Sequence, residues 1–263
     1  MKYKIFSELT YEVIEPTTYI FNIQVAKTLN QIIVNESISI SPDLKFEEFS
    51  LTNSENRFLK LQINYGTFTI SYNAIVEVEE KPINQDLFEF DTSIIELDND
   101  VLPFISPSRH CESDKLLHFA KKEFGQLPNV YSKVKAINDW VFNSIEYISD
   151  STNSSTSACD TLISRFGVCK DFAHLCIAFC RALDIPARYF TGYAANLIPP
   201  DIHACFEAYI CGQWIIFDPT KLTNTKNLVK IANGKDASEV AVASYHGNTI
   251  CTKMIVQCEE IIV

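Results

Sequence analysis

The sequence is short of basic residues and of long apolar stretches. Lysine and arginine together number 22 against 33 acidic residues, which gives a formal net charge of −11 over 263 residues. Nucleic-acid binding requires concentrated positive charge, so we expect no nucleic-acid partner. No apolar run approaches the roughly 18 residues that a membrane-spanning helix needs, so we expect no membrane partner either.

The chain also lacks the cysteine spacings of a metal finger or a disulfide framework. Its nine cysteines are an odd number, and no Cys-x-x-Cys pair occurs. We therefore predict that most of them are reduced thiols, and we expect no metal and no cofactor. The N-terminus has two lysines but no apolar run of signal-peptide length, so we expect a cytoplasmic protein.

The first 97 residues predict an all-β unit. Short β-branched and aromatic runs are separated by polar turns, and several alternate with the period of two that half-buried strands show. Examples are Tyr19–Val25, Gln31–Val34, Ser37–Ile40, Phe58–Ile63 and Thr67–Tyr72. We interpret residues 1–97 as a sandwich or an open barrel that acts as a scaffold or shapes the substrate site. Residues 98–112, with Pro103 and Pro107, have the composition of a linker.

Residues 113–263 predict an α+β domain. Apolar residues at helical spacing indicate helices from Ser113 to about Gly125 and over residues 131–147, and a short helical turn at 160–166 precedes a buried helix that begins at Cys169. Strands follow at residues 188–193, 202–210 and 213–217, and the tail over 238–263 supplies more. Helices followed by antiparallel strands are typical of an α+β fold.

A cysteine at the start of that buried helix is the candidate nucleophile. Cys169 follows Gly167 and Val168, where free backbone N–H groups at the helix end stabilise a thiolate. Asp171 in the same turn opposes this effect on the thiolate. The helix end alone is therefore insufficient, and the chemistry requires an imidazolium partner.

Two downstream residues complete the candidate site. If Cys211 and Gly212 form a two-residue hairpin turn, period two places His203 and Asp218 on one face, about 7–8 Å apart between backbones. A three-residue loop would reverse this parity. We predict that Cys169 attacks a carbonyl carbon, that His203 stabilises the thiolate and protonates the leaving group, and that Asp218 fixes the imidazole tautomer. The backbone N–H of Cys169 is the predicted oxyanion donor, and the sequence indicates no second one.

These motifs resemble the transglutaminase-like superfamily. The residues that carry the resemblance are Gly167–Leu175, Ile185–Tyr189, Gly192-Tyr193, His203-Ala204, Phe206-Glu207, Trp214 and Phe217-Asp218-Pro219. Pro107-Ser108-Arg109, Cys111–Asp114 and Ser155–Ala158 are similar to the bacterial subgroup described as transglutaminase-like cysteine proteases, which has a β-rich N-terminal domain. The likeness covers nearly the whole chain.

The resemblance implies a papain-like catalytic core with Cys169, His203 and Asp218 as its triad. Relatives usually have an aromatic residue, often Trp, two positions after the histidine, where this chain has Cys205. We therefore predict substrate contacts for Cys205, and also for Trp214 and Tyr193, for which core packing is the alternative.

Other interpretations remain open at this stage. The resemblance favours hydrolysis of a peptide or protein amide through a thioester, whereas an amine acceptor would make the protein a transglutaminase. A non-catalytic peptide-binding module on the same fold is the third alternative. His174, Cys176 and Cys180 could form a metal-binding face, although an apolar helix stripe explains both thiols. A redox disulfide between Cys205 and Cys169 would inactivate the site reversibly.

Overall fold

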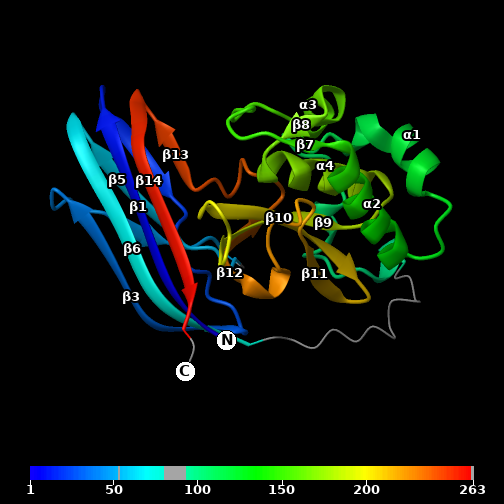
Figure 1. Cartoon of the computed structure of the whole chain (residues 1–263), viewed down its shortest axis with the longest axis horizontal. Coiled ribbons are helices and arrows are strands. Elements are labelled where there is room, and N and C mark those ends of the chain that lie inside the picture. The colour runs from blue at the N-terminus through cyan, green and yellow to red at the C-terminus, as the bar shows by residue number, and fades with distance from the viewer. Residues whose placement is uncertain (53, 80–92, 262–263) are drawn as a thin grey trace.

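The computed structural model describes residues 1–52, 54–79 and 93–261. Two units lie side by side, one made of β-strands and one of helices packed on a sheet (Figure 1). Residues 80–92, near the end of the predicted N-terminal domain (residues 1–97), lie outside the described residues.

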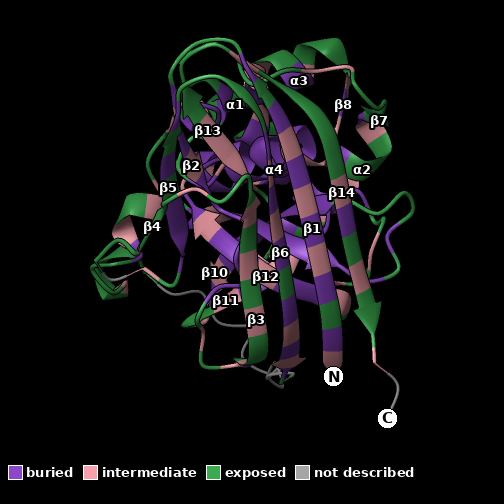
Figure 2. Cartoon of the chain, turned by 90° about the vertical axis from the view of Figure 1, so that its left-hand side faces the viewer, coloured by how far each residue is buried: buried purple, intermediate pink, exposed green. Residues whose placement is uncertain are grey.

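The β-strand unit is a sandwich of two four-stranded antiparallel sheets. One sheet has the order β14-β1-β6-β3, formed by β1 (Lys2–Val13), β3 (Gln31–Ser41), β6 (Gly66–Val78) and β14 (Thr249–Glu260). The other has the order β13-β2-β5-β4, formed by β2 (Thr17–Phe21), β4 (Glu47–Phe49), β5 (Phe58–Ile63) and β13 (Ala243–His246). Buried and more exposed residues alternate along β1, as period two requires (Figure 2).

Aromatic side chains join the two sheets of the sandwich. The ring centroids of Tyr11 on β1 and Tyr19 on β2 lie 5.2 Å apart, and those of Tyr19 and Phe68 on β6 lie 4.9 Å apart. These edge-to-face contacts add to the apolar area that the sheets bury between them. The predicted sandwich-like N-terminal fold is confirmed.

The C-terminal tail belongs to this sandwich. β14 pairs with β1 along its whole length, and β13 pairs with β2. The prediction that the tail adds strands to the α+β domain over 113–263 is therefore wrong. Alternation identifies a strand in a sequence but does not name its partner, and here the partners lie more than two hundred residues away.

The helical unit is built around one central helix. Its helices are α1 (Ser113–Phe124), α2 (Val130–Ser144), α3 (Ala158–Ser164) and α4 (Cys169–Ala182). Every residue of α4 from Asp171 to Ala182 is buried, because α1, α2, α3 and two strands pack around it. No helix in the described ranges is long and apolar enough to cross a membrane.

The segment predicted as a linker is packed against this helix. The buried guanidinium of Arg181 on α4 donates to the Ser106 carbonyl at 3.2 Å and to the Ser108 hydroxyl at 3.0 Å, and Cys111 is fully buried. Arg181 and the burial of His110 and Cys111 thus hold residues 106–111 to the helical unit, although Ser106, Pro107 and Arg109 stay exposed. The linker prediction for 98–112 stays a prediction.

The sheet beside the central helix has the order β11-β10-β9-β12. Its strands are β9 (Ala187–Ala194), β10 (Ile202–Ile210), β11 (Gln213–Phe217) and β12 (Leu228–Gly234). Tyr209 pairs with Trp214 and Glu207 with Ile216, which confirms the predicted hairpin register. Cys211 and Gly212 have φ of 50° and 79°, as a two-residue type I′ turn requires.

Polar contacts fix the sandwich to this sheet. The Asn56 amide donates to the Asn233 carbonyl at 2.7 Å and accepts from the Asn233 N–H at 3.0 Å. The Tyr193 hydroxyl, on β9, donates to the Ile23 carbonyl at 2.6 Å and lies 2.8 Å from the Ser7 hydroxyl. Tyr193 is fully buried between the units. This burial favours the core-packing alternative for Tyr193, and its predicted contact with substrate stays a prediction.

Candidate active site

Cys169 begins α4 at a turn whose shape depends on Gly167. Asp171 folds back over this turn, and its Oδ2 accepts from the Val168 N–H at 2.9 Å and from the Thr152 hydroxyl at 2.6 Å. A Cβ atom at position 167 would lie 2.7 Å from the Asp171 Cβ, so the turn admits only glycine. The turn leaves Cys169 partly exposed at the helix N-terminus.

The charge of Asp171 is balanced within the same turn. The Lys170 Nζ lies 2.5 Å from the Asp171 Oδ1 and 3.1 Å from the Thr152 Oγ1. Asp171 therefore serves as the cap that holds the helix start, and the neighbouring ammonium offsets the repulsion between its carboxylate and a thiolate.

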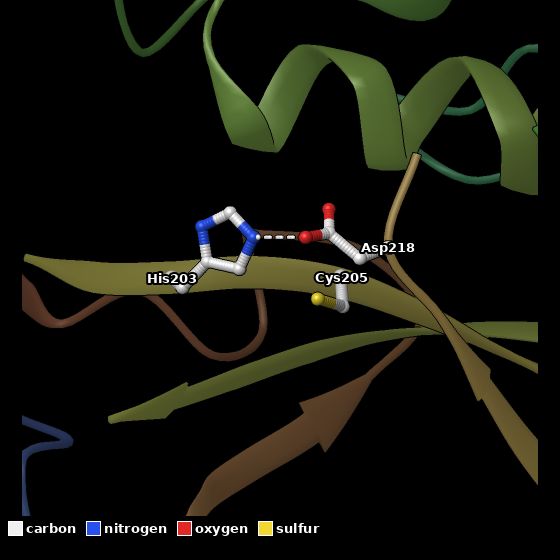
Figure 3. Close-up of side chains that lie close together, drawn as sticks. All are labelled: His203, Cys205 and Asp218. Atoms are coloured by element: carbon white, nitrogen blue, oxygen red, sulfur yellow. Dashed lines mark ion pairs between the residues drawn. The ribbon is translucent and has the colours of Figure 1, made fainter. Parts of the chain in front are cut away.

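His203 and Asp218 form a buried pair. The His203 Nε2 lies 3.1 Å from the Asp218 Oδ2, and the other ring nitrogen points away from the carboxylate (Figure 3). Asp218 also accepts from the Thr220 N–H at 2.9 Å, the Thr220 hydroxyl at 2.7 Å and the Thr223 N–H at 3.1 Å. Burial alone would raise the pKa of Asp218, but these hydrogen bonds, led by that of His203, lower it.

His203 also lies near enough to the Cys169 thiol for the thiol to affect its pKa. Burial lowers the pKa of His203, but the Asp218 carboxylate, which accepts from the ring, and then the neighbouring thiols of Cys169 and Cys205 outweigh it, and the net effect is a raised pKa. The structure thus places the three predicted residues near one another, with His203 paired to Asp218 at 3.1 Å. This environment favours an imidazolium, which is the partner that a thiolate needs.

Cys205 lies under this pair and is fully buried. It packs with Phe190, Leu197 and Leu228, and burial raises the pKa of its thiol to about 12. Cys205 has no exposed surface, so its predicted contact with substrate stays a prediction. All nine cysteines lie within the described ranges, and each is a free thiol, Cys169 and Cys205 included.

One group of side chains has metal-ligand chemistry. Ligand atoms of His203, Cys205 and Asp218 all lie within 4.8 Å of one another, and nitrogen, sulfur and oxygen are ligands that zinc accepts. The hydrogen bond between His203 and Asp218 already explains why two of these three side chains lie close together. His174, Cys176 and Cys180 do not form such a group; both thiols are buried in the helix core.

Trp214 lines a cavity that does not include Cys169, His203 or Asp218. The Arg188 guanidinium stacks 4.1 Å from the centre of its ring, and the Phe104 ring packs edge-on at 5.3 Å. Trp214 lines a cavity of about 790 Å³ together with residues of both units, including Gln31 and Glu55 of the sandwich. Cys169, His203 and Asp218 do not line it. The predicted substrate contact of Trp214 stays a prediction.

The sequence reasoning missed three residues of the site. Thr220 and Thr223 hold the Asp218 carboxylate. For Thr220 the signal was present in the sequence, because Asp side chains accept from backbone N–H groups two residues on; Thr223, five residues on, has no such signal. Tyr147 meets the backbone of Cys169. It has no local signal, because a strand pairing brings it there.

A partly exposed thiol at a helix start, next to a buried His–Asp pair on an antiparallel sheet, defines a protein of the cysteine-dependent acyl-transfer class. Comparison with known proteins agrees. Residues 118–219 match the model of the transglutaminase-like superfamily, and residues 1–100 match that of the bacterial transglutaminase N-terminal domain. The chain belongs to the transglutaminase-like superfamily.

Individual relatives were found among solved structures and among curated proteins. The crystal structure of a candidate cysteine protease from Cytophaga hutchinsonii is 53% identical, with a TM-score of 0.97, and the match covers 100% of this chain and 91% of that one. An uncharacterized protein from Mycobacterium leprae is 32% identical over 117 residues, which are 41% of this chain and 42% of that protein. One from Mycobacterium tuberculosis is 28% identical over 144 residues, 49% of this chain and 46% of that protein. The chain thus matches less than half the length of these curated relatives.

Proposed function

We propose that the protein transfers an acyl group from a peptide or protein amide through a thioester on Cys169, most simply by hydrolysis. One observation carries this proposal: the buried His203 ring is paired with the Asp218 carboxylate at 3.1 Å, and the thiol at the start of α4 lies near enough to help raise the pKa of the ring. A nucleophile, a base and a group that orients the base occur in that order in thiol-dependent acyl transfer.

In the proposed reaction the thiolate of Cys169 attacks the amide carbon, and a sulfur–carbon bond forms. The proton on His203 passes to the leaving nitrogen as the carbon–nitrogen bond breaks, and the amine departs. A water molecule then attacks the thioester while His203 accepts its proton, and the thiolate leaves with the sulfur–carbon electron pair. Asp218 keeps one tautomer of the ring throughout, because its Oδ2 fixes the Nε2.

Hydrolysis is favoured over transamidation because the Cytophaga relative, at 53% identity, is described as a candidate cysteine protease. The same thioester would serve a transglutaminase if an amine replaced water. We also propose that the protein works in a reducing compartment such as the cytoplasm, since its nine cysteines are free thiols, several of them buried in the core.

The test is turnover of a peptide library with and without a primary amine, followed by mass spectrometry. Hydrolysis predicts cleaved peptides in both conditions, whereas transamidation predicts amine conjugates. Cys169→Ala should abolish both, and Cys251→Ala, which removes an exposed thiol on β14, should abolish neither. Peptide binding without any turnover, equal in the wild type and in Cys169→Ala, would refute the proposal and indicate a binding module.

A further inference from the structure

We propose that the Tyr147 hydroxyl is the second donor to the oxyanion that forms on the substrate carbonyl during attack by Cys169. This rests on the proposed function, which supplies the reaction but names only one donor, the backbone N–H of Cys169.

Tyr147 is held beside the cysteine by a small sheet. Strand β7 (Glu146–Tyr147) runs parallel to β8 (Phe166–Gly167), with Tyr147 opposite Gly167. The Ile148 N–H donates to the Gly167 carbonyl at 3.0 Å, and the Glu146 N–H to that of Arg165 at 2.8 Å. Because β8 leads directly into the Cys169 turn, this pairing fixes the distance between the tyrosine backbone and the nucleophile.

The Tyr147 side chain is also held against the first turn of α4. Its ring packs against Phe172, one turn into α4, with the centroids 5.9 Å apart. Its hydroxyl lies near enough to the backbone N–H of Cys169 for that group to lower its pKa in part. Tyr147 is 43% exposed, so a substrate can reach this residue.

The phenol keeps its proton at neutral pH. Partial burial raises the pKa of Tyr147, and the neighbouring Cys169 raises it further, while the Cys169 N–H lowers it only in part. A protonated phenol is a hydrogen-bond donor.

An oxyanion in acyl transfer lies within hydrogen-bond distance of preorganised N–H and O–H groups. The phenol and the Cys169 N–H lie near each other at the start of α4. When a substrate oxygen accepts from that N–H, the adjacent O–H can turn toward the same oxygen, so that two donors converge. The other polar side chains of the turn are already engaged, since Lys170 and Thr152 both bind the Asp171 carboxylate.

The test compares two reactions of the same thiol in Tyr147→Phe and in the wild type. With p-nitrophenyl acetate the thiolate attacks the ester carbon, the sulfur–carbon bond forms through an oxyanion, and p-nitrophenolate leaves with the electron pair of the broken carbon–oxygen bond. With iodoacetamide the thiolate displaces iodide from a saturated carbon, and no oxyanion forms. Tyr65→Phe, an exposed tyrosine at the β5–β6 turn of the sandwich, is the matched control.

We expect Tyr147→Phe to slow acylation of Cys169 on the order of 10²-fold, because losing one oxyanion donor has that effect, and to leave iodoacetamide alkylation unchanged. Tyr65→Phe should match the wild type in both reactions. Equal acylation by the wild type and Tyr147→Phe would overturn the role of Tyr147 while leaving the proposed function intact. Parallel losses in both reactions would also overturn it, because the tyrosine would then act on the thiolate. Failure of the wild type itself to acylate Cys169 would instead refute the proposed function.

Discussion

Two histidines of this protein are equally buried and behave in opposite ways. His203 and His174 are each 1% exposed, yet the pKa of His203 is raised whereas that of His174 falls to about 3. The His203 ring is paired with the Asp218 carboxylate at 3.1 Å, and the thiols of Cys169 and Cys205 also raise its pKa. The His174 Nε2 accepts from the Ala237 N–H at 3.2 Å, and its Nδ1 has no hydrogen-bond partner among the described residues. Burial alone therefore does not decide the charge of a histidine; the partners of its ring nitrogens do.

The surroundings of His174 indicate a structural role. Its ring stacks on His110 with centroids 5.0 Å apart. The nearby Asp236 accepts from the His110 N–H at 2.9 Å and from the Ser238 hydroxyl at 2.6 Å, so this carboxylate is occupied by backbone and hydroxyl donors. The cluster joins the segment before α1 to the loop after β12, and through His174 it contacts the helix that carries Cys169.

The largest expected effect comes from removing the carboxylate that distinguishes the two histidines. Asp218→Asn leaves a side chain of the same shape but no negative charge, so the His203 ring should lose its proton more easily and adopt the wrong tautomer. We expect acylation of Cys169 by p-nitrophenyl acetate to fall roughly 10⁴-fold, as for an orienting aspartate in a triad. Asp139→Asn, which removes an exposed carboxylate paired with Lys221, should have no such effect. Equal rates in the two variants would contradict the comparison.

The next effect concerns stability in acid. The folded pKa of His174, about 3, lies below its ordinary value of 6.5, so the unfolded chain binds the proton more readily. Its contribution to the free energy of unfolding is fully present above pH 6.5 and is lost as the pH falls toward 3, by roughly 3–5 kcal/mol.

Urea unfolding of the wild type and of His174→Gln over this pH range tests this account. We expect a flatter pH dependence in His174→Gln, since glutamine does not titrate. Parallel curves would show that His174 is not the group that takes up the proton.

A smaller loss of stability is expected at the junction of the two units. Tyr193→Phe removes the hydroxyl that bonds the Ile23 carbonyl and Ser7, and it leaves that buried carbonyl without this donor. We expect the free energy of unfolding to fall by about 1–3 kcal/mol, with the alkylation rate of Cys169 unchanged. Tyr209→Phe, at a partly exposed hydroxyl, is the control. A slower alkylation would show that Tyr193 also supports the site.

The smallest expected effect tests which contacts hold the Asp218 carboxylate in place. Thr220→Ala removes a hydroxyl that donates to the carboxylate at 2.7 Å, whereas Thr223→Ala keeps the backbone N–H through which Thr223 acts. We expect Thr220→Ala to lower the acylation rate by about 5- to 10-fold, equivalent to roughly 1 kcal/mol, and Thr223→Ala to leave it unchanged. The reverse order would mean that the Thr223 side chain has a role that its contacts do not suggest.

Local patterns predicted the parts of the fold that depend on neighbours in sequence. The hairpin register followed from the two residues Cys211 and Gly212, because turn length fixes which residues pair. That register allowed the contact between His203 and Asp218 to be predicted before any coordinates. The start of α4 at Cys169 was also predicted, because helix-ending and helix-starting residues act within one turn.

Features that depend on distant partners could not be predicted in this way. β14 reads as a strand, but nothing in its sequence selects β1 as its neighbour. The sequence around Tyr193 leaves both substrate contact and core packing open, and only the packing of the sandwich shows that this residue is buried. Tyr147 is separated from Cys169 by a polar segment and α3, so its contact with the cysteine emerges only from the pairing of β7 with β8.

The central claim is that His203 stabilises a thiolate on Cys169, and the rate of Cys169 alkylation by iodoacetamide against pH tests it most directly. With His203 in place we expect rapid labelling well below the ordinary thiol pKa of about 8.5, and His203→Ala should lose that labelling. If the wild type and His203→Ala showed the same pH dependence of alkylation, the imidazole would not stabilise the thiolate of Cys169, and the account of the site would be contradicted.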